Sequence, residues 1–138
     1  MKQVIQRTLL VATILVVLVL TGALTAAAQH GYRVTKRVIF KSGQISTSVR
    51  GTIPNTLEGH EYVFRAREGQ TMLVKLSSAK KEIGFFIQTP DGEMLDQETA
   101  LRRWSGELPA SGDYHLVINT LAQGAARYTL VILIASDI

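Results

Sequence analysis

The stretch RRWSGELPASGDYHLVIN (residues 102–119) contains a Pro-Ala-Ser-Gly-Asp turn between two strand-like runs. Proline presets φ and glycine tolerates positive φ, so this composition predicts a tight turn. After the turn, Tyr114, Leu116 and Ile118 alternate with His115, Val117 and Asn119, which is the period of a half-buried strand. The stretch therefore predicts a strand, a turn and a second strand.

The same period-2 alternation recurs from residue 37 to residue 134, in short runs separated by turn residues at a spacing of roughly 10–12 residues. No helical period accompanies it. The pattern predicts an all-β chain, a two-sheet antiparallel β-sandwich of about seven to nine short strands. The residues expected to be buried together between the sheets are Tyr62, Phe64, Val74, Phe85, Leu116, Leu130 and Ile132.

The sequence also predicts the structure of five individual segments. Residues 29–35 are predicted to be a loose lead, followed by a first strand over residues 37–40. His60 is expected in a loop, and residues 98–103 in a loop rather than in a turn of helix. The almost continuously apolar run 128–134 is predicted to be a central strand covered on both faces, because an exposed edge of that composition would aggregate.

The first 28 residues have the pattern of an export signal. Lys2 and Arg7 precede an apolar run, and Ala26-Ala27-Ala28 offers small residues for cleavage after Ala28. The alternative is an uncleaved anchor, since residues 8–24 are at the short limit for crossing a bilayer. The mature chain would be a single β-sandwich domain of residues 29–138, periplasmic or secreted. It contains no cysteine, so its core must hold the fold without disulfides.

The mature chain shows little sign of catalysis. Its three histidines have no metal-ligand spacing, and it has no Gly-x-Ser-x-Gly elbow, so neither an enzyme, a metal site nor a cofactor is predicted. Residues 91–96 suit a hairpin turn better than a calcium loop, because the ligand pattern of a known loop is missing. Thirteen basic and 11 acidic side chains remain after removal of Lys2 and Arg7, which does not favour nucleic acid as a partner.

Two aromatic residues near the turn each allow two interpretations. Trp104, the only tryptophan, is either a core side chain or a rim anchor for a partner, with the core favoured. Tyr114 follows a turn and is in phase with Leu116 and Ile118. That position favours a ring that points inward and seals the corner by a hydrogen bond to the backbone upstream. The alternative is that Tyr114 contacts a partner.

Seven segments together carry a family resemblance: RVIF (37–40), Gly51, YVFRA (62–66), EGQTM (68–72), RWSG (103–106), LPASGDY (108–114) and ARYTL (126–130). They cover almost the whole mature chain. In this order they resemble motifs of the periplasmic inhibitors of goose-type lysozyme, and more broadly those of bacterial pre-peptidase C-terminal domains.

This resemblance implies a proteinaceous lysozyme inhibitor whose loop Ser111-Gly112-Asp113-Tyr114 enters the enzyme's cleft. Trp104 and Arg103 would lie near that loop on its rim. The expected partner is a lysozyme of the goose type. The alternative function is a non-catalytic β-sandwich module that binds cell-wall glycan, such as peptidoglycan, or protein.

Overall fold

Eight β-strands make up the part of the chain that the computed structural model describes, residues 31–136. The predicted signal peptide lies outside the described residues. Within them there is no helix long and apolar enough to cross a membrane. The strands are β1 (Tyr32–Arg37), β2 (Ser46–Ile53), β3 (Glu58–Ala66), β4 (Thr71–Ser77), β5 (Ile83–Gln88), β6 (Arg103–Glu107), β7 (Gly112–Thr120) and β8 (Ala126–Ala135).

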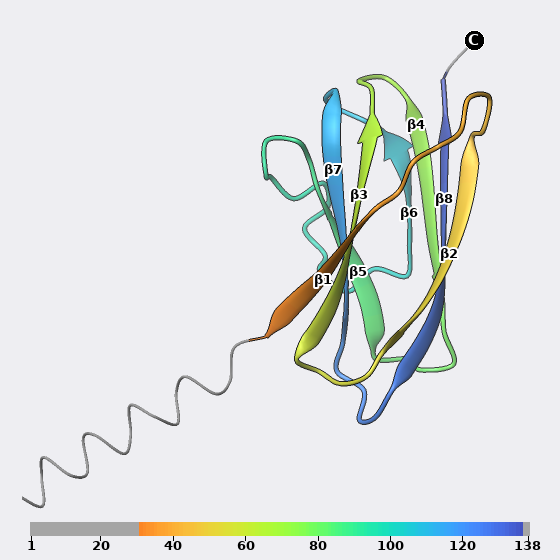
Figure 1. The fold of residues 1–138 in the computed structure, drawn as a ribbon. Helices are drawn as coiled ribbons and strands as arrows, with labels where there is room; N and C mark the ends of the chain where they lie inside the picture. Colours follow the sequence, from red (N-terminus) through yellow and green to blue (C-terminus); the bar gives the residue numbers. More distant parts are fainter. Residues whose placement is uncertain (1–30, 137–138) are drawn as a thin grey trace, which may run out of the picture. The chain divides into compact units, whose positions relative to one another are not determined.

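The strands form two four-stranded sheets that pack face to face (Figure 1). Sheet A has the order β1-β3-β7-β5, and sheet B has the order β2-β8-β4-β6. This arrangement confirms the predicted sandwich. One pairing departs from the antiparallel expectation, because β1 runs parallel to β3. After β1 the chain crosses to sheet B to form β2 and returns to sheet A only with β3, so β1 and β3 are not joined by a hairpin.

The core lies between the sheets and is built from alternate residues of the central strands. All seven residues predicted to be buried together are buried in one hydrophobic cluster. Strand β8 is central in sheet B, as predicted, with Leu130 and Ile132 fully buried. Its other face is not fully covered, because Val131 and Leu133 are only half-buried on the outside of sheet B. The expectation that both faces of this strand are covered is therefore wrong.

The first strand lies upstream of its predicted position. Residues 32–37 form β1, whereas the sequence analysis assigned residues 29–35 to a loose lead and 37–40 to the strand. Tyr32 and Val34 alternate with Arg33 and Thr35, but the alternation stops at Lys36, and all six residues of β1 are exposed. Val38 ends the pairing: its N–H donates to the carbonyl of Val63 (2.8 Å), and its side chain is buried.

The connection between β5 and β6 contains the predicted hairpin turn and no helix. The amide of Thr89 donates to the carbonyl of Glu93 (2.8 Å), and Gly92, with φ of 86°, donates to the carbonyl of Thr89 (2.9 Å). Farther along, Leu101 bridges to Phe85 and so covers the edge of sheet A. Residues 98–102 form a loop of bends with one isolated bridge at Leu101, as predicted, whereas Arg103, which the predicted loop included, is the first residue of β6.

Candidate functional site

The connection between β6 and β7 carries the chain from sheet B to sheet A, at the end of the sandwich where β3 leads into β4. Leu108 opens this connection and is buried. Its amide donates to the carbonyl of Gln70 (2.8 Å), and its own carbonyl accepts from the amide of Gly69 (2.9 Å). The connection is therefore fixed at its start to the β3–β4 turn.

The Ser-Gly step of the loop is held from two sides. Ser111 is exposed, and its Oγ accepts a hydrogen bond from the amide of Glu68 (2.9 Å). The hydroxyl proton of Ser111 is not used in that bond and remains available to a partner. Gly112 has a φ of 142°, and a Cβ there would lie 2.9 Å from the Cβ of Pro90, so a side chain at this position would be strained.

Tyr114 closes the loop from inside. Its hydroxyl donates to the carbonyl of Ala110 (2.6 Å) and accepts a longer bond from the amide of Ala110 (3.3 Å). The ring is fully buried and stacks on Phe64 with centroids 5.9 Å apart. Burial raises the pKa of Tyr114, which keeps the hydroxyl protonated as a donor. The structure thus has the corner that the sequence favours, with the ring of Tyr114 enclosed in the core.

Asp113 lies on the outer face of sheet A and makes a two-point ion pair with Arg37. The two guanidinium nitrogens of Arg37 donate to the two carboxylate oxygens at 3.1 and 2.9 Å. Hydrogen bonding to Arg37 holds the pKa of Asp113 below its ordinary value. Because Arg37 is the last residue of β1 and Asp113 the second residue of β7, the pair spans β3 and ties the base of the loop to the edge strand.

A second ionic cluster lies farther along the same face, around Glu61 of β3. Its carboxylate accepts from the Oγ1 of Thr35 (2.8 Å), lies 3.1 Å from the Nδ1 of His115 and is 3.8 Å from a guanidinium nitrogen of Arg33. Partial burial raises the pKa of Glu61, but the hydrogen bonds from Thr35 and His115 and the nearby positive charges outweigh it, so the pKa is lowered. The outer face of sheet A thus pairs both of its strand carboxylates.

The structure does not place Trp104 and Arg103 on the rim of the loop. Alternate residues of β6 face opposite sides of sheet B. Trp104 is half-buried against the core, opposite Val74, and its ring lies over Gly106. The core interpretation of Trp104 is confirmed. Arg103 is exposed and opposite Lys75 on the outside of sheet B, whereas Asp113 is on the outside of sheet A, so the expected grouping of Arg103 with the loop is wrong.

A buried polar network between the sheets was not predicted from the sequence. His60 belongs to β3, not to a loop, and is buried. Its Nδ1 lies 2.6 Å from the hydroxyl of Tyr128 and its Nε2 lies 3.2 Å from a carboxylate oxygen of Glu58. The same Tyr128 hydroxyl is 2.5 Å from that of Tyr62. The signal that could have placed His60 in the strand is its spacing, since it lies two residues before Tyr62 and four before Phe64 and so shares their face.

This network has the residue types of an acid, a histidine and a hydroxyl, but its geometry suits a structural role. The hydroxyl of Tyr128 is shared with Tyr62 inside the sandwich, and burial raises its pKa far above the ordinary value, so it stays neutral. A catalytic nucleophile must instead reach a substrate. Within residues 31–136, no group of three or more acidic, histidine or cysteine side chains is placed to hold a metal ion.

Solved structures with the same fold include lysozyme inhibitors. PliG of Aeromonas hydrophila, a periplasmic lysozyme inhibitor of g-type lysozyme, superposes with a TM-score of 0.66 at 23% identity, over 75% of this chain and 98% of that chain. PliG of Salmonella Typhimurium, described in the same words, has a TM-score of 0.57 and 26% identity, over 72% of this chain and 96% of that one.

The pre-peptidase C-terminal domain of collagenase from Bacillus anthracis also has this fold, with a TM-score of 0.53 and 9% identity, over 74% of this chain and 95% of that domain. No protein-family model matches the chain, and no curated protein matches its sequence. Both groups that the sequence resembles therefore appear among the structures with this fold, which confirms the resemblance.

Proposed function

We propose that this protein is a proteinaceous inhibitor of a goose-type lysozyme and acts in the periplasm or outside the cell. The observation that carries the proposal is the structural similarity to two periplasmic inhibitors of g-type lysozyme, which extends over 98% and 96% of their chains. Nearly all of each solved inhibitor chain therefore has a counterpart in this chain. The inhibitor needs no catalytic group, which is consistent with the enclosed position of the His60 network.

The contact surface in this proposal is the loop of residues 109–113. The loop is exposed at Pro109 and Ser111, and its anchors are internal: Leu108 bonds to the β3–β4 turn, and Tyr114 bonds back to the backbone at Ala110. A loop held in one shape loses little conformational entropy when it binds. Rigidity of this kind suits insertion into a preformed cleft.

The chemistry of the loop fits a glycoside hydrolase cleft. Such a cleft holds a catalytic carboxyl and hydrogen-bonding groups that otherwise contact sugar hydroxyls. The free hydroxyl proton of Ser111 can donate to a carboxylate or carbonyl of the enzyme, while Glu68 keeps the Oγ in place. Asp113 stays neutralised by Arg37 beside the loop, so no unpaired negative charge is brought toward the enzyme's own carboxyl.

The test is an inhibition assay with the exported protein, purified from its native host, against goose-type, chicken-type and invertebrate-type lysozymes at matched salt. We expect inhibition of the goose-type enzyme at micromolar concentration or below. Ser111→Ala should weaken it by about 30-fold, the effect of losing ~2 kcal/mol at a central contact. Ser105→Ala removes an exposed serine from sheet B and is the matched control.

The results of this assay test the inhibitor function and the assignment of the loop as its contact surface separately. If the wild-type protein inhibits none of the enzymes, the inhibitor function is wrong. If it inhibits one and Ser111→Ala is as good as Ser105→Ala, the function stands and the loop assignment fails. The intact mass of the same preparation tests export, since a chain that still contains residues 1–28 would contradict cleavage after Ala28.

A further inference from the structure

The outer face of sheet B carries four exposed cations on adjacent strands. They are Arg50 of β2, Arg127 of β8, Lys75 of β4 and Arg103 of β6. The strand register places them on one face as two pairs, Arg50 with Arg127 and Lys75 with Arg103. Arg50 is opposite Thr129, which is two residues from Arg127, and Lys75 is opposite both Val131 and Arg103. The cations therefore extend across the whole width of the sheet.

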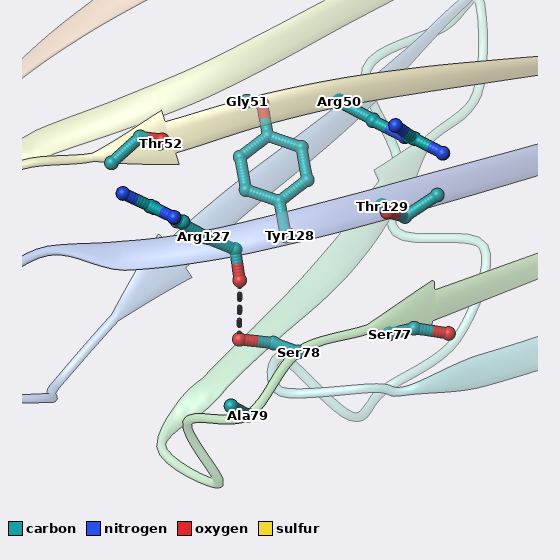
Figure 2. Close-up of a pocket in the computed structure, with 9 residues that line it drawn as sticks. All are labelled: Arg50, Gly51, Thr52, Ser77, Ser78, Ala79, Arg127, Tyr128 and Thr129. Atoms are coloured by element: carbon teal, nitrogen blue, oxygen red, sulfur yellow. Dashed lines mark hydrogen bonds between the residues drawn. The ribbon is translucent and has the colours of Figure 1, made fainter.

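A shallow depression lies at the β2 and β8 side of this face (Figure 2). Arg50 and Arg127 extend to opposite sides of Tyr128, and the ring of Tyr128 turns toward Gly51 (Figure 2). Hydroxyl groups and small residues make up the rest of the lining, and Ser78 is fixed by donating its hydroxyl to the carbonyl of Arg127 (2.5 Å). The remaining lining residues are Thr52, Ser77, Ala79 and Thr129.

These cations have no intramolecular role that the structure reveals. Across residues 31–136, none of the four forms an ion pair with a carboxylate, in contrast to Arg37 and Arg33 on sheet A. Lys75 and Arg103 are directly opposite one another, and like charges in that position destabilise a sheet. Selection for folding alone would not favour this arrangement. An external anion that binds between the strands would relieve the repulsion.

We propose that the outer face of sheet B binds a linear anionic polysaccharide. Cations spread over neighbouring strands match acidic groups repeated along a chain, and arginine binds carboxylate or phosphate oxygens through two donors. The hydroxyls of Ser77, Thr52 and Thr129 match the sugar hydroxyls between the acidic groups. This site lies on the side opposite to Asp113, so it does not depend on the proposed lysozyme contact.

Other anionic partners fit this face less well. Single-stranded nucleic acid is typically bound by aromatic side chains on which bases stack, and no aromatic side chain projects from the outer face of sheet B, where Trp104 and Tyr128 both point inward. Stable attachment to a lipid surface adds the insertion of apolar groups to the attraction between cations and anionic lipids, whereas the apolar residues of this face, Val131, Leu133 and Leu73, are half-buried in the sheet.

The test measures binding of a fluorescein-labelled alginate oligosaccharide to the exported protein by anisotropy at low and physiological salt. The variant is the double substitution Arg50→Gln and Arg127→Gln. The matched control is Lys36→Gln with Lys41→Gln, which removes the same charge from exposed positions away from sheet B's outer face. We expect the first pair to weaken binding at least tenfold and the control pair to weaken it by less than threefold.

Binding to the wild type should also weaken as salt increases. In a ¹⁵N spectrum of the wild type, the alginate oligosaccharide should shift the amides of residues 50–52, 75–78 and 127–129, a readout that needs no variant. The proposal is overturned if the wild type does not bind, if both double variants lose affinity equally, or if phosphatidylglycerol vesicles or oligo-dT bind more tightly than alginate. Lysozyme inhibition should be unchanged in the double variant Arg50→Gln with Arg127→Gln. A failure of the polysaccharide proposal can therefore be told apart from a failure of the proposed inhibitor function.

Discussion

The two outer faces of the sandwich use their charged residues differently. On sheet A, Asp113 is held by Arg37 and Glu61 by Thr35, His115 and Arg33. On sheet B, four cations stand without a carboxylate partner among the described residues. Charges on sheet A fix the position of the loop that we propose as the lysozyme contact, whereas those on sheet B remain free to bind something outside the protein.

The stability of the fold depends little on these surface charges. Ion pairs between exposed groups typically contribute about 0–1 kcal/mol to stability. The pairs on sheet A therefore set local geometry more than they stabilise the fold. The hydrophobic core between the two sheets supplies the stability. Substitutions in that core are therefore expected to have the largest effects, and substitution of a surface charge the smallest.

The largest effect is expected at β8, where adjacent residues face the core and the outside of sheet B. Leu130→Ala should destabilise the protein by ~2–5 kcal/mol, because Leu130 is fully buried. Val131→Ala on the half-buried outer side should cost about 1 kcal/mol or less. Chemical unfolding measures both. Equal losses of stability in the two variants would contradict the assignment of Leu130 to the buried face of β8 and of Val131 to its half-buried outer face.

The next effect concerns the hydroxyl of Tyr128, which links the two sheets inside the core. Tyr128→Phe removes the partner of both His60 and Tyr62, and each buried polar group left without a partner costs ~1–3 kcal/mol. Tyr62→Phe removes only one of these contacts and should cost less. A melting temperature for Tyr128→Phe at or above that of Tyr62→Phe would show that the network does not join the sheets.

A smaller loss is expected at the corner under the loop. Tyr114→Phe keeps the stacked ring and removes the bond to Ala110, which typically contributes ~0.5–1.5 kcal/mol. Hydrogen exchange at the amide of Ala110 should become faster, and inhibition should weaken because the loop is less fixed. Unchanged exchange at Ala110 would argue that the other anchors hold the loop without Tyr114.

The smallest effect on stability, but a specific one, is expected from Arg37→Gln. Loss of the guanidinium should raise the pKa of Asp113 toward its ordinary value, which a carbon-detected NMR titration measures directly. A lowered pKa stabilises the fold above the ordinary pKa, and this contribution is lost as pH falls through the folded-state pKa. Wild type and variant should therefore differ slightly at neutral pH and converge in acid. An unchanged pKa for Asp113 would exclude the pair as a feature of the protein in solution.

The sequence predicted the sandwich because its central strands bury one face. In β4, period-2 alternation follows from one buried and one more exposed side of the strand. In β3 and β7 the core side is buried too, but Val63 and Val117 on the outer side are also buried, so alternation of burial is weaker there. Strand β1 was missed because its apolar alternation is limited to Tyr32 and Val34 and stops at Lys36, which leaves only a short signal. Its parallel pairing with β3 depends on where the chain crosses between sheets, which alternation does not encode.

The candidate site was predictable only in part. The turn chemistry of residues 109–112 and the corner role of Tyr114 follow from residue type and phase. The separation of Arg103 from the loop, the link between Arg37 and Asp113, and the network at His60 depend on which strands become neighbours. Residues far apart in sequence meet there, and no local pattern reports such contacts.

The most direct test of the central claim is a ¹⁵N spectrum of the exported protein titrated with a goose-type lysozyme that it inhibits. We expect shifts and line broadening to concentrate on residues 109–113 and on the adjoining turn of residues 67–70, with sheet B's cations at positions 50, 75, 103 and 127 unaffected. Changes confined to the outer face of sheet B, or a spectrum that does not change at a molar excess of the enzyme, would contradict it.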